Sequence, residues 1–211
     1  MIIAVDGPAA AGKGTLARAL ARHFGFDFLD TGSLYRMVAL CVLSRKHDPR
    51  DSQAATAAAK SLDPNAWNAE ALRSEAVGQA ASIVAAIPAV RVALLDLQRS
   101  FAARKPGAVL DGRDIGTVVC PDAEAKIFVT ASPEERARRR TRELLERGEA
   151  IGYEAVLADI HERDARDRSR SFAPLVPAGD AYVLDTTNLD IDAAVAAAIR
   201  YVETRVAKRS A

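Results

Sequence analysis

Gly7-Pro8-Ala9-Ala10-Ala11-Gly12-Lys13-Gly14-Thr15 follows an apolar run at residues 2–6 and opens a segment of helical spacing, residues 13–24. A strand, a glycine-rich turn and a helix in this order favour a phosphate-binding loop, because backbone N–H groups and the helix N-terminus can face one phosphate chain. We expect Lys13 to reach the β- and γ-phosphates of a nucleoside triphosphate. Gly14 stands where the common pattern has serine or threonine, so the nearest hydroxyl is that of Thr15.

The composition indicates one globular domain of 211 residues, with 49% hydrophobic and 27% charged residues. Its net charge of +1 disfavours a general nucleic-acid or anionic-membrane binder. The longest uncharged stretch, residues 76–90, is shorter than the ~20 apolar residues of a membrane helix. Cys41 and Cys120 provide no disulfide framework, and we interpret both as reduced core residues. We expect a cytoplasmic monomer, and no secretory signal is visible at the N-terminus.

Short apolar runs alternate with helical segments, which predicts an α/β fold: a five-stranded parallel sheet with helices on both faces. The expected strands are residues 2–6, 26–29, 108–111, 126–130 and 181–185. In such a sheet, ligands bind at the carboxyl ends of the strands.

The helical segments carry their own signals. Residues 52–103 are expected to be entirely helical, with one buried stripe: Val90, Leu94, Leu97 and Phe101. Ser132, Pro133 and Glu135 predict a helix start, and this helix should end near Arg147 and Gly148. Another helix is expected over about 154–168. The last helix follows Asp190 and should bury one face: Ile191, Val195, Ile199, Val202 and Val206.

Two further segments at the same edge of the sheet carry candidate anion ligands. Thr31 and Arg36 follow the second strand, although a plain helix cap with a solvated arginine would have the same sequence. Asp111-Gly112-Arg113-Asp114 follows the third strand and offers a guanidinium between two carboxylates, for which an internal ion pair is the alternative.

Residues 134–170 contain ten arginines, ten acids and no lysine, a preference that favours forked contacts with phosphate or carboxylate groups. Three of the arginines share one helix face and are expected to contact ATP: Arg136, Arg139 and Arg140. For four others we favour ordinary ion pairs along exposed helices: Arg138, Arg142, Arg147 and Arg166. The GTPase elements Asp-x-x-Gly and Asn-Lys-x-Asp are absent from the sequence, and the length fits a small phosphotransferase.

In these motifs the chain resembles the bacterial cytidylate kinases, of the nucleoside monophosphate kinase group of P-loop kinases. The resemblance covers nearly the whole chain and rests on residues 7–15, 30–36, 111–119, 126–128, 162–168 and 173–175. Adenylate kinases instead carry Asp-Gly-Phe-Pro-Arg after the third strand. One departure is a shortened helical stretch at residues 63–67, where many members have an insert with short β-strands.

The resemblance implies transfer of the γ-phosphate of ATP to CMP or dCMP, giving ADP and CDP or dCDP, with Mg²⁺. It assigns the acceptor's α-phosphate to Thr31, Arg36, Arg113 and Arg170. It assigns ribose or phosphate contacts to Arg163 and Asp167. It assigns cytosine recognition to Ser82, Arg91 and Asp114, because an aspartate accepts from the N4 amine and an arginine donates to O2 and N3.

On this interpretation the catalytic residues are Lys13, Arg113, Arg163 and Arg170. Asp111 lies where a carboxylate would orient Mg²⁺ through water, with Thr15 as the second candidate; a structural role is the alternative for Asp111. Residues 31–105 would bind the nucleoside monophosphate and residues 148–172 would form a lid, hinged near Gly148 and Gly152, that excludes water. The alternatives are a kinase of another small acceptor, such as UMP or a non-nucleotide acid, and a nucleotide-binding module without catalysis.

Overall fold

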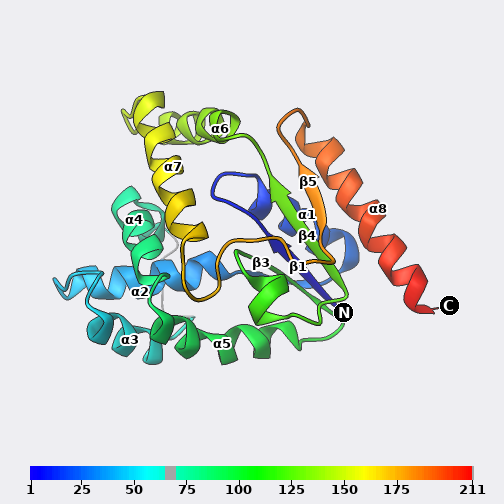
Figure 1. Ribbon diagram of the computed structural model, residues 1–211, viewed down its shortest axis with the longest axis horizontal. Helices are drawn as coiled ribbons and strands as arrows, with labels where there is room; N and C mark the ends of the chain where they lie inside the picture. The colour runs from blue at the N-terminus through cyan, green and yellow to red at the C-terminus, as the bar shows by residue number, and fades with distance from the viewer. Residues whose placement is uncertain (65–69, 211) are drawn as a thin grey trace. The chain divides into compact units, whose positions relative to one another are not determined.

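The structure, a computed structural model, describes residues 1–64 and 70–210 (Figure 1). The chain divides into two compact units. The sheet unit comprises residues 1–29 and 102–211, and the helical unit comprises residues 30–101. The shortened stretch at residues 63–67 falls partly on residues 65–69, which lie outside the described residues.

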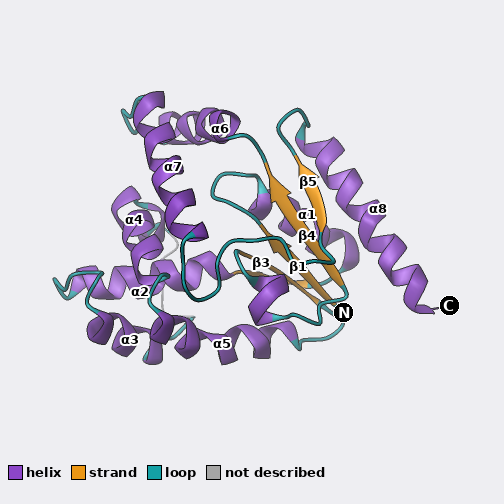
Figure 2. Cartoon of the chain, viewed as in Figure 1, coloured by secondary structure: helices purple, strands orange, loops and turns teal. Residues whose placement is uncertain are grey.

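The sheet unit contains the five predicted strands, drawn in orange in Figure 2: β1 (Ile2–Asp6), β2 (Asp27–Asp30), β3 (Ala108–Gly112), β4 (Ala125–Thr130) and β5 (Tyr182–Asp185). Their order is β2-β3-β1-β4-β5, and β1 pairs in parallel with both β3 and β4. The prediction of an α/β fold with a five-stranded parallel sheet is confirmed. Because β1 is central, the loop that leaves it has the ends of β3 and β4 as neighbours.

Four helices and one π-helical turn complete the sheet unit: α1 (Lys13–Phe24), η2 (Ile115–Val119), α6 (Pro133–Glu146), α7 (Tyr153–Arg168) and α8 (Ile191–Ser210). The predicted start of α6 is confirmed, since the Ser132 hydroxyl accepts from the backbone N–H of Glu135 at 3.2 Å. The helix ends before Gly148, whose φ of 78° is readily adopted only by glycine.

The core of the sheet unit lies between the sheet and helices α1 and α8, and strand side chains alternate into it. It contains Ile3, Val5, Val109, Ile127, Leu16, Leu20, Ala194, Ala198 and Val202. The predicted buried face of α8 is therefore wrong in part. Ile191 and Val206 are 65% and 40% exposed, because the buried face runs instead through the small residues Ala194 and Ala198.

The helical unit consists of α2 (Thr31–Ser44), α3 (Ser52–Lys60), the short η1 (Ala71–Arg73), α4 (Glu75–Val84) and most of α5 (Pro88–Ala102). The predicted apolar face of α5 is only partly buried. Val90 and Leu94 are buried, whereas Leu97 and Phe101 are half-buried. Gln98 is buried in their place because its amide donates to the Leu94 carbonyl at 3.1 Å.

Within the described residues no single helix is long and apolar enough to cross a membrane; α4 and α5 meet that criterion only as a pair bent by 99°. The prediction for the cysteines holds for Cys120, which is buried. Cys41 is free as predicted, but it is half-buried on α2 and not in the core.

Candidate functional site

The loop between β1 and α1 has the backbone geometry of a tight phosphate cradle. Gly7 adopts a φ of +146°, and a Cβ there would overlap the carbonyl oxygen of Val129 on β4. Gly12 and Ala10 also have positive φ values, 87° and 58°. Positive φ values at these three positions let the chain curl around an anion, and only glycine fits at the position that touches β4.

Lys13 lies folded over this loop. Its side chain is 6% exposed, and its ammonium donates to the Pro8 carbonyl at 2.8 Å. Asp111 at the end of β3 lies close to it, with Nζ of Lys13 and Oδ1 of Asp111 3.9 Å apart. Lys13 is therefore fixed at the loop, where an incoming phosphate would meet its charge.

Gly14 explains how Asp111 approaches the loop. A Cβ at Gly14 would lie 3.3 Å from Oδ2 of Asp111, so the missing side chain leaves room for this carboxylate. Thr15 is exposed and lines the neighbouring cavity. Among the residues that the structure describes there is no group of three or more His, Cys, Asp or Glu side chains suited to a metal ion.

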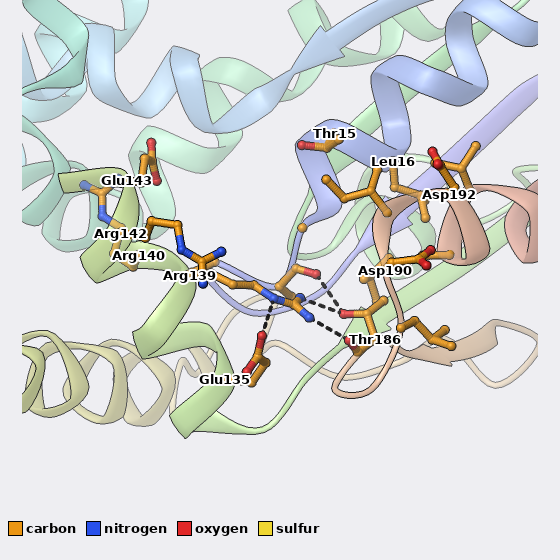
Figure 3. A pocket seen from close by; sticks show the side chains of 18 residues that line it. Thr15, Leu16, Glu135, Arg139, Arg140, Arg142, Glu143, Thr186, Asp190 and Asp192 are labelled. Carbon is orange, nitrogen blue, oxygen red and sulfur yellow. Dashed lines mark hydrogen bonds and ion pairs between the residues drawn. The ribbon is translucent and has the colours of Figure 1, made fainter. Parts of the chain in front are cut away.

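A cavity of ≈ 810 Å³ lies beside the loop, within the size range of small-molecule sites (Figure 3). Its walls come from the loop and α1 (Gly12, Thr15), from α6 (Arg139, Arg140, Arg142) and from the segment after β5 (Thr186, Leu189, Asp190). The last wall was missed by the sequence analysis. Its signal was a threonine directly after a strand, since the carboxyl ends of parallel strands share one edge of the sheet.

Arg139 crosses the cavity wall from α6 to the segment after β5 (Figure 3). Its guanidinium donates to the Thr186 carbonyl at 2.7 Å and hydroxyl at 3.1 Å, and to Glu135 at 3.0 Å. Arg140 lies on the same wall and pairs with Glu143 at 2.9 Å. Both predicted arginines thus lie at the cavity.

Arg136 differs from the prediction that it contacts ATP. Its side chain is 1% exposed, and its guanidinium forms two parallel hydrogen bonds to the carboxylate of Asp164 on α7. The cause is tertiary: α7 packs on α6 and covers this position. Three arginines predicted to form ordinary ion pairs do so, Arg138 with Glu135, Arg147 with Glu143 and Arg166 with Glu162. The fourth, Arg142, lines the cavity instead.

A second basic cluster joins the end of β3 to the end of α7. Asp167, 1% exposed, accepts from Nε of Arg113 at 3.1 Å and also pairs with Arg170. Burial opposes ionisation of Asp167, but the charges of Arg113, Arg170 and Arg163 lower the pKa of its carboxyl below the ordinary value. Three guanidinium groups around one carboxylate leave positive charge, which suits an anion such as a phosphate.

Asp6 connects the loop to the turn that follows Arg113. Its two carboxylate oxygens accept from the backbone N–H groups of Ile115 at 2.8 Å and Gly116 at 2.7 Å. Burial raises the pKa of Asp6 to about 7, against the lowering effect of these two bonds, and the charges of Asp114 and Asp111 add to the rise. The sequence analysis did not single out Asp6, although a carboxylate at the end of a buried strand is itself a signal.

Of the remaining predicted residues, Asp114 is buried just after β3 in the sheet unit, and the other four lie in the helical unit. Arg36 on α2 donates to the Leu72 carbonyl at 2.8 Å, and its guanidinium lies against Gly78 of α4. Arg91 on α5 donates to the Ala85 carbonyl at 3.0 Å and lies 5.3 Å from the ring centre of Tyr35. Ser82 and Thr31 are 2% and 3% exposed. Arg91 thus lies beside Tyr35, the residue of α2 that precedes Arg36.

Comparisons with known proteins show the family to which the chain belongs. The sequence model of the family described as cytidylate kinase matches residues 3–204. A cytidylate kinase of Methylocella silvestris is 61% identical over 204 residues, 97% of this chain and 94% of that protein. A cytidylate kinase of Bradyrhizobium diazoefficiens is 58% identical over 210 residues, 100% and 99% of the two chains.

Among solved structures, an uncharacterized protein from Eubacterium ventriosum has a TM-score of 0.57 at 15% identity, covering 96% of this chain and 98% of that one. This likeness concerns the fold alone. The sequence comparisons are stronger evidence. The family model matches 202 of the 211 positions, and relatives covered over nearly their full length are about 60% identical. The chain therefore belongs to the cytidylate kinase family.

Proposed function

We propose that the protein transfers the γ-phosphate of ATP to CMP or dCMP, giving ADP and CDP or dCDP. The observation that carries the proposal is the pair of anion sites at the end of β3. Asp111 adjoins Lys13 of the phosphate loop, and Arg113, two residues later, adjoins Asp167 and Arg170. One strand end thus serves both a donor and an acceptor site, which is what transfer between two phosphates requires.

ATP would bind with its triphosphate on residues 7–15 and its nucleoside in the cavity of ≈ 810 Å³. Lys13 supplies the positive charge at the β- and γ-phosphates. Arg139 and Arg140 line the same cavity and are the arginines of α6 that we assign to ATP. Arg136 is left out of this assignment because its guanidinium is buried in its contact with Asp164.

Mg²⁺ is part of the proposal. A nucleotide-bound Mg²⁺ needs only one or two carboxylates, because phosphate oxygens and water complete its octahedron. The carboxylate of Asp111, beside Lys13 and Gly14, fits this requirement, and Thr15 is the nearest hydroxyl on α1. When bound, the ion would neutralise negative charge on the β- and γ-phosphates.

The acceptor phosphate would be held by Arg113, Arg163 and Arg170, with Asp167 fixing the guanidinium groups or contacting the ribose. Thr31 and Arg36 would complete this site. Cytosine would be recognised by Ser82, Arg91 and Asp114. No general base is needed, since a phosphate monoester has a second pKa near ~6 and is largely a dianion at neutral pH.

Three further assignments belong to the proposal and rest on sequence alone. Residues 31–105 bind the acceptor nucleotide, and residues 148–172 act as a lid that excludes water. The enzyme works as a cytoplasmic monomer on small molecules, without a nucleic-acid or membrane partner.

The test is an acceptor panel. Purified protein with ATP and Mg²⁺ is offered CMP, dCMP, UMP, AMP, GMP and shikimate, and both ADP release and the phosphorylated product are measured. We expect the highest kcat/KM for CMP or dCMP. A preference for UMP or shikimate would assign the other acceptor, and ATP binding without any phosphorylated product would indicate a non-catalytic module. The variant Lys13→Ala, purified identically, controls for contaminating kinases.

A further inference from the structure

A deeply buried ion pair lies outside both proposed phosphate sites. Arg136 of α6 and Asp164 of α7 have side chains 1% and 5% exposed. Nη1 and Nη2 of Arg136 meet Oδ1 and Oδ2 of Asp164 at 3.0 and 2.7 Å, and Nε donates to the Ala131 carbonyl at 2.9 Å. Such a forked pair fixes the angle between its two partners as well as their distance.

The same guanidinium also touches the phosphate loop. Nη1 of Arg136 donates to the carbonyl of Ala9 at 3.3 Å. The next residue, Ala10, packs against a small apolar cluster that α6 and α7 share, containing Leu144, Val156 and Ile160. The tip of the loop is therefore held to both helices by one polar and one apolar contact.

The contact with Ala9 belongs to a pattern. A cradle that turns its N–H groups toward an anion turns its carbonyl groups outward, where they need donors. Three carbonyls of this loop have such donors: Pro8 from Lys13 at 2.8 Å, Ala9 from Arg136, and Ala11 from the Thr186 hydroxyl at 3.3 Å. Arg136 thus shapes the loop from its outer side.

At its other end the pair adjoins the acceptor cluster. Asp164 lies three residues, about one helical turn, before Asp167 on α7. Asp167 in turn holds Arg113 and Arg170. Consecutive turns of one helix are therefore fixed, the first to the donor loop through Arg136 and the second to the acceptor arginines.

Stability does not account for this arrangement. Replacing a buried ion pair by apolar side chains of similar size is often neutral or stabilising, because the charges no longer lose their hydration. The pair is therefore weak evidence for a role in stability, whereas the orientation that it imposes on α6 and α7 follows directly from its geometry.

We propose that Arg136 and Asp164 are positioning residues that couple the phosphate loop to α7, so that ATP on the loop holds Arg163, Asp167 and Arg170 in place for the acceptor phosphate. This inference rests on the proposed phosphoryl transfer. Neither side chain touches a substrate.

The test compares wild type with the double variant Arg136→Met plus Asp164→Leu, which keeps the volume of the pair and removes its polar contacts. The matched control is Glu162→Gln, which alters an exposed ion pair on the same helix. Arg136→Lys is the second variant, because it keeps the charge but loses the fork and with it the simultaneous contacts to Ala9, Ala131 and Asp164. It serves where the double variant does not fold.

Two readouts are measured at matched folded fraction. The first is hydrogen exchange of residues 153–168 with and without a non-hydrolysable ATP analogue, in the absence of CMP. We expect the analogue to slow exchange in wild type and in Glu162→Gln, and to lose this effect in the double variant and in Arg136→Lys. The second is steady-state kinetics, where kcat/KM for CMP should fall at least about tenfold and by up to about a hundredfold.

A folded variant with wild-type kinetics and a wild-type exchange response to the analogue would overturn the proposed coupling. Arg136 and Asp164 would then have only a structural role. The proposed function fails separately, if the wild-type protein forms no CDP. The exchange experiment still decides the coupling in that case, because it needs ATP binding alone.

Discussion

Replacing Asp6 by asparagine should remove a pH dependence of stability that the wild-type chain carries. Burial raises the pKa of Asp6 from 3.8 to about 7 in the folded protein, so the folded state holds a proton that the unfolded state releases. Between these two values stability must fall as the pH rises. The rise of the pKa from 3.8 to about 7 corresponds to about 4 kcal/mol of unfolding free energy, at 1.36 kcal/mol per pKa unit.

Three acids of the sheet unit with lowered pKa values do not contribute in this pH window. Hydrogen bonds and nearby charges lower the pKa of Asp167, Asp180 and Asp185 below the ordinary value. These groups add stability that is present above the pKa of the unfolded acid and is lost as the pH falls through the lower, folded value. Their contribution is therefore constant above about pH 5.

The assay is urea unfolding followed by far-UV circular dichroism at about pH 5 and about pH 8, where we expect wild type to lose roughly 2–3 kcal/mol. Asp6→Asn cannot ionise and should lose much less. Asp122→Asn, an exposed acid of the same unit, is the matched control and should keep the wild-type loss. The reasoning is refuted if Asp6→Asn and wild type lose the same free energy between the two pH values.

Three further predictions concern the phosphate loop and the acceptor site. Lys13→Ala should lower kcat by roughly 10²–10³-fold with little change in melting temperature, whereas loss of the exposed Lys60 should change neither; near wild-type turnover would remove Lys13 from the mechanism. Gly7→Ala should cost about 3 kcal/mol or more in urea unfolding, because a Cβ meets the Val129 carbonyl; a loss under about 1 kcal/mol would contradict this geometry. Asp114→Ala should raise the KM for CMP about tenfold or more and narrow the preference for CMP over UMP; an unchanged ratio of their kcat/KM values would exclude cytosine recognition by Asp114.

Features set by local sequence could be predicted. The loop after β1 and the start of α6 depend on residues within a few positions of one another, such as Gly7 to Lys13 and Ser132 to Glu135. Strands β3 and β4 are buried runs whose apolar character does not depend on their partners. Their bounds accordingly differ from the predicted ones by one residue at most.

Features that depend on partners far away in the sequence could not be predicted. Spacing places Arg136 on one face with Arg139 and Arg140, but which of the three meets the cavity depends on α7. Asp164 lies 28 residues further along the chain and takes up the guanidinium of Arg136. Thr186, which the analysis missed, acts through Ala11, 175 residues away.

Helix α8 illustrates a related limit. Two faces of this helix are apolar, one with isoleucine and valine and the other with alanine, and periodicity favours the larger side chains. The structure buries Ala194 and Ala198, because small residues let a helix approach its neighbour closely. Pattern therefore identifies an amphipathic helix more reliably than it identifies which apolar stripe is covered.

Apart from Lys126 on β4, the buried charged residues of the sheet unit gather around the loop, the end of β3 and α7: Asp6, Lys13, Asp111, Asp114, Arg136, Asp164 and Asp167. Each loses hydration on burial, which an apolar side chain would not, so their clustering is not explained by stability. A phosphoryl group in transfer spreads negative charge over its oxygens and is stabilised most by charges that need no reorganisation. Buried partners can hold the positive groups of the site in place: Arg136 is bonded at all three of its nitrogens, and one of them also donates to the loop carbonyl of Ala9. If this is the reason for their burial, apolar replacement of the Arg136 and Asp164 pair should leave a protein as stable as wild type and a poorer catalyst, a combination that a purely structural pair would not produce.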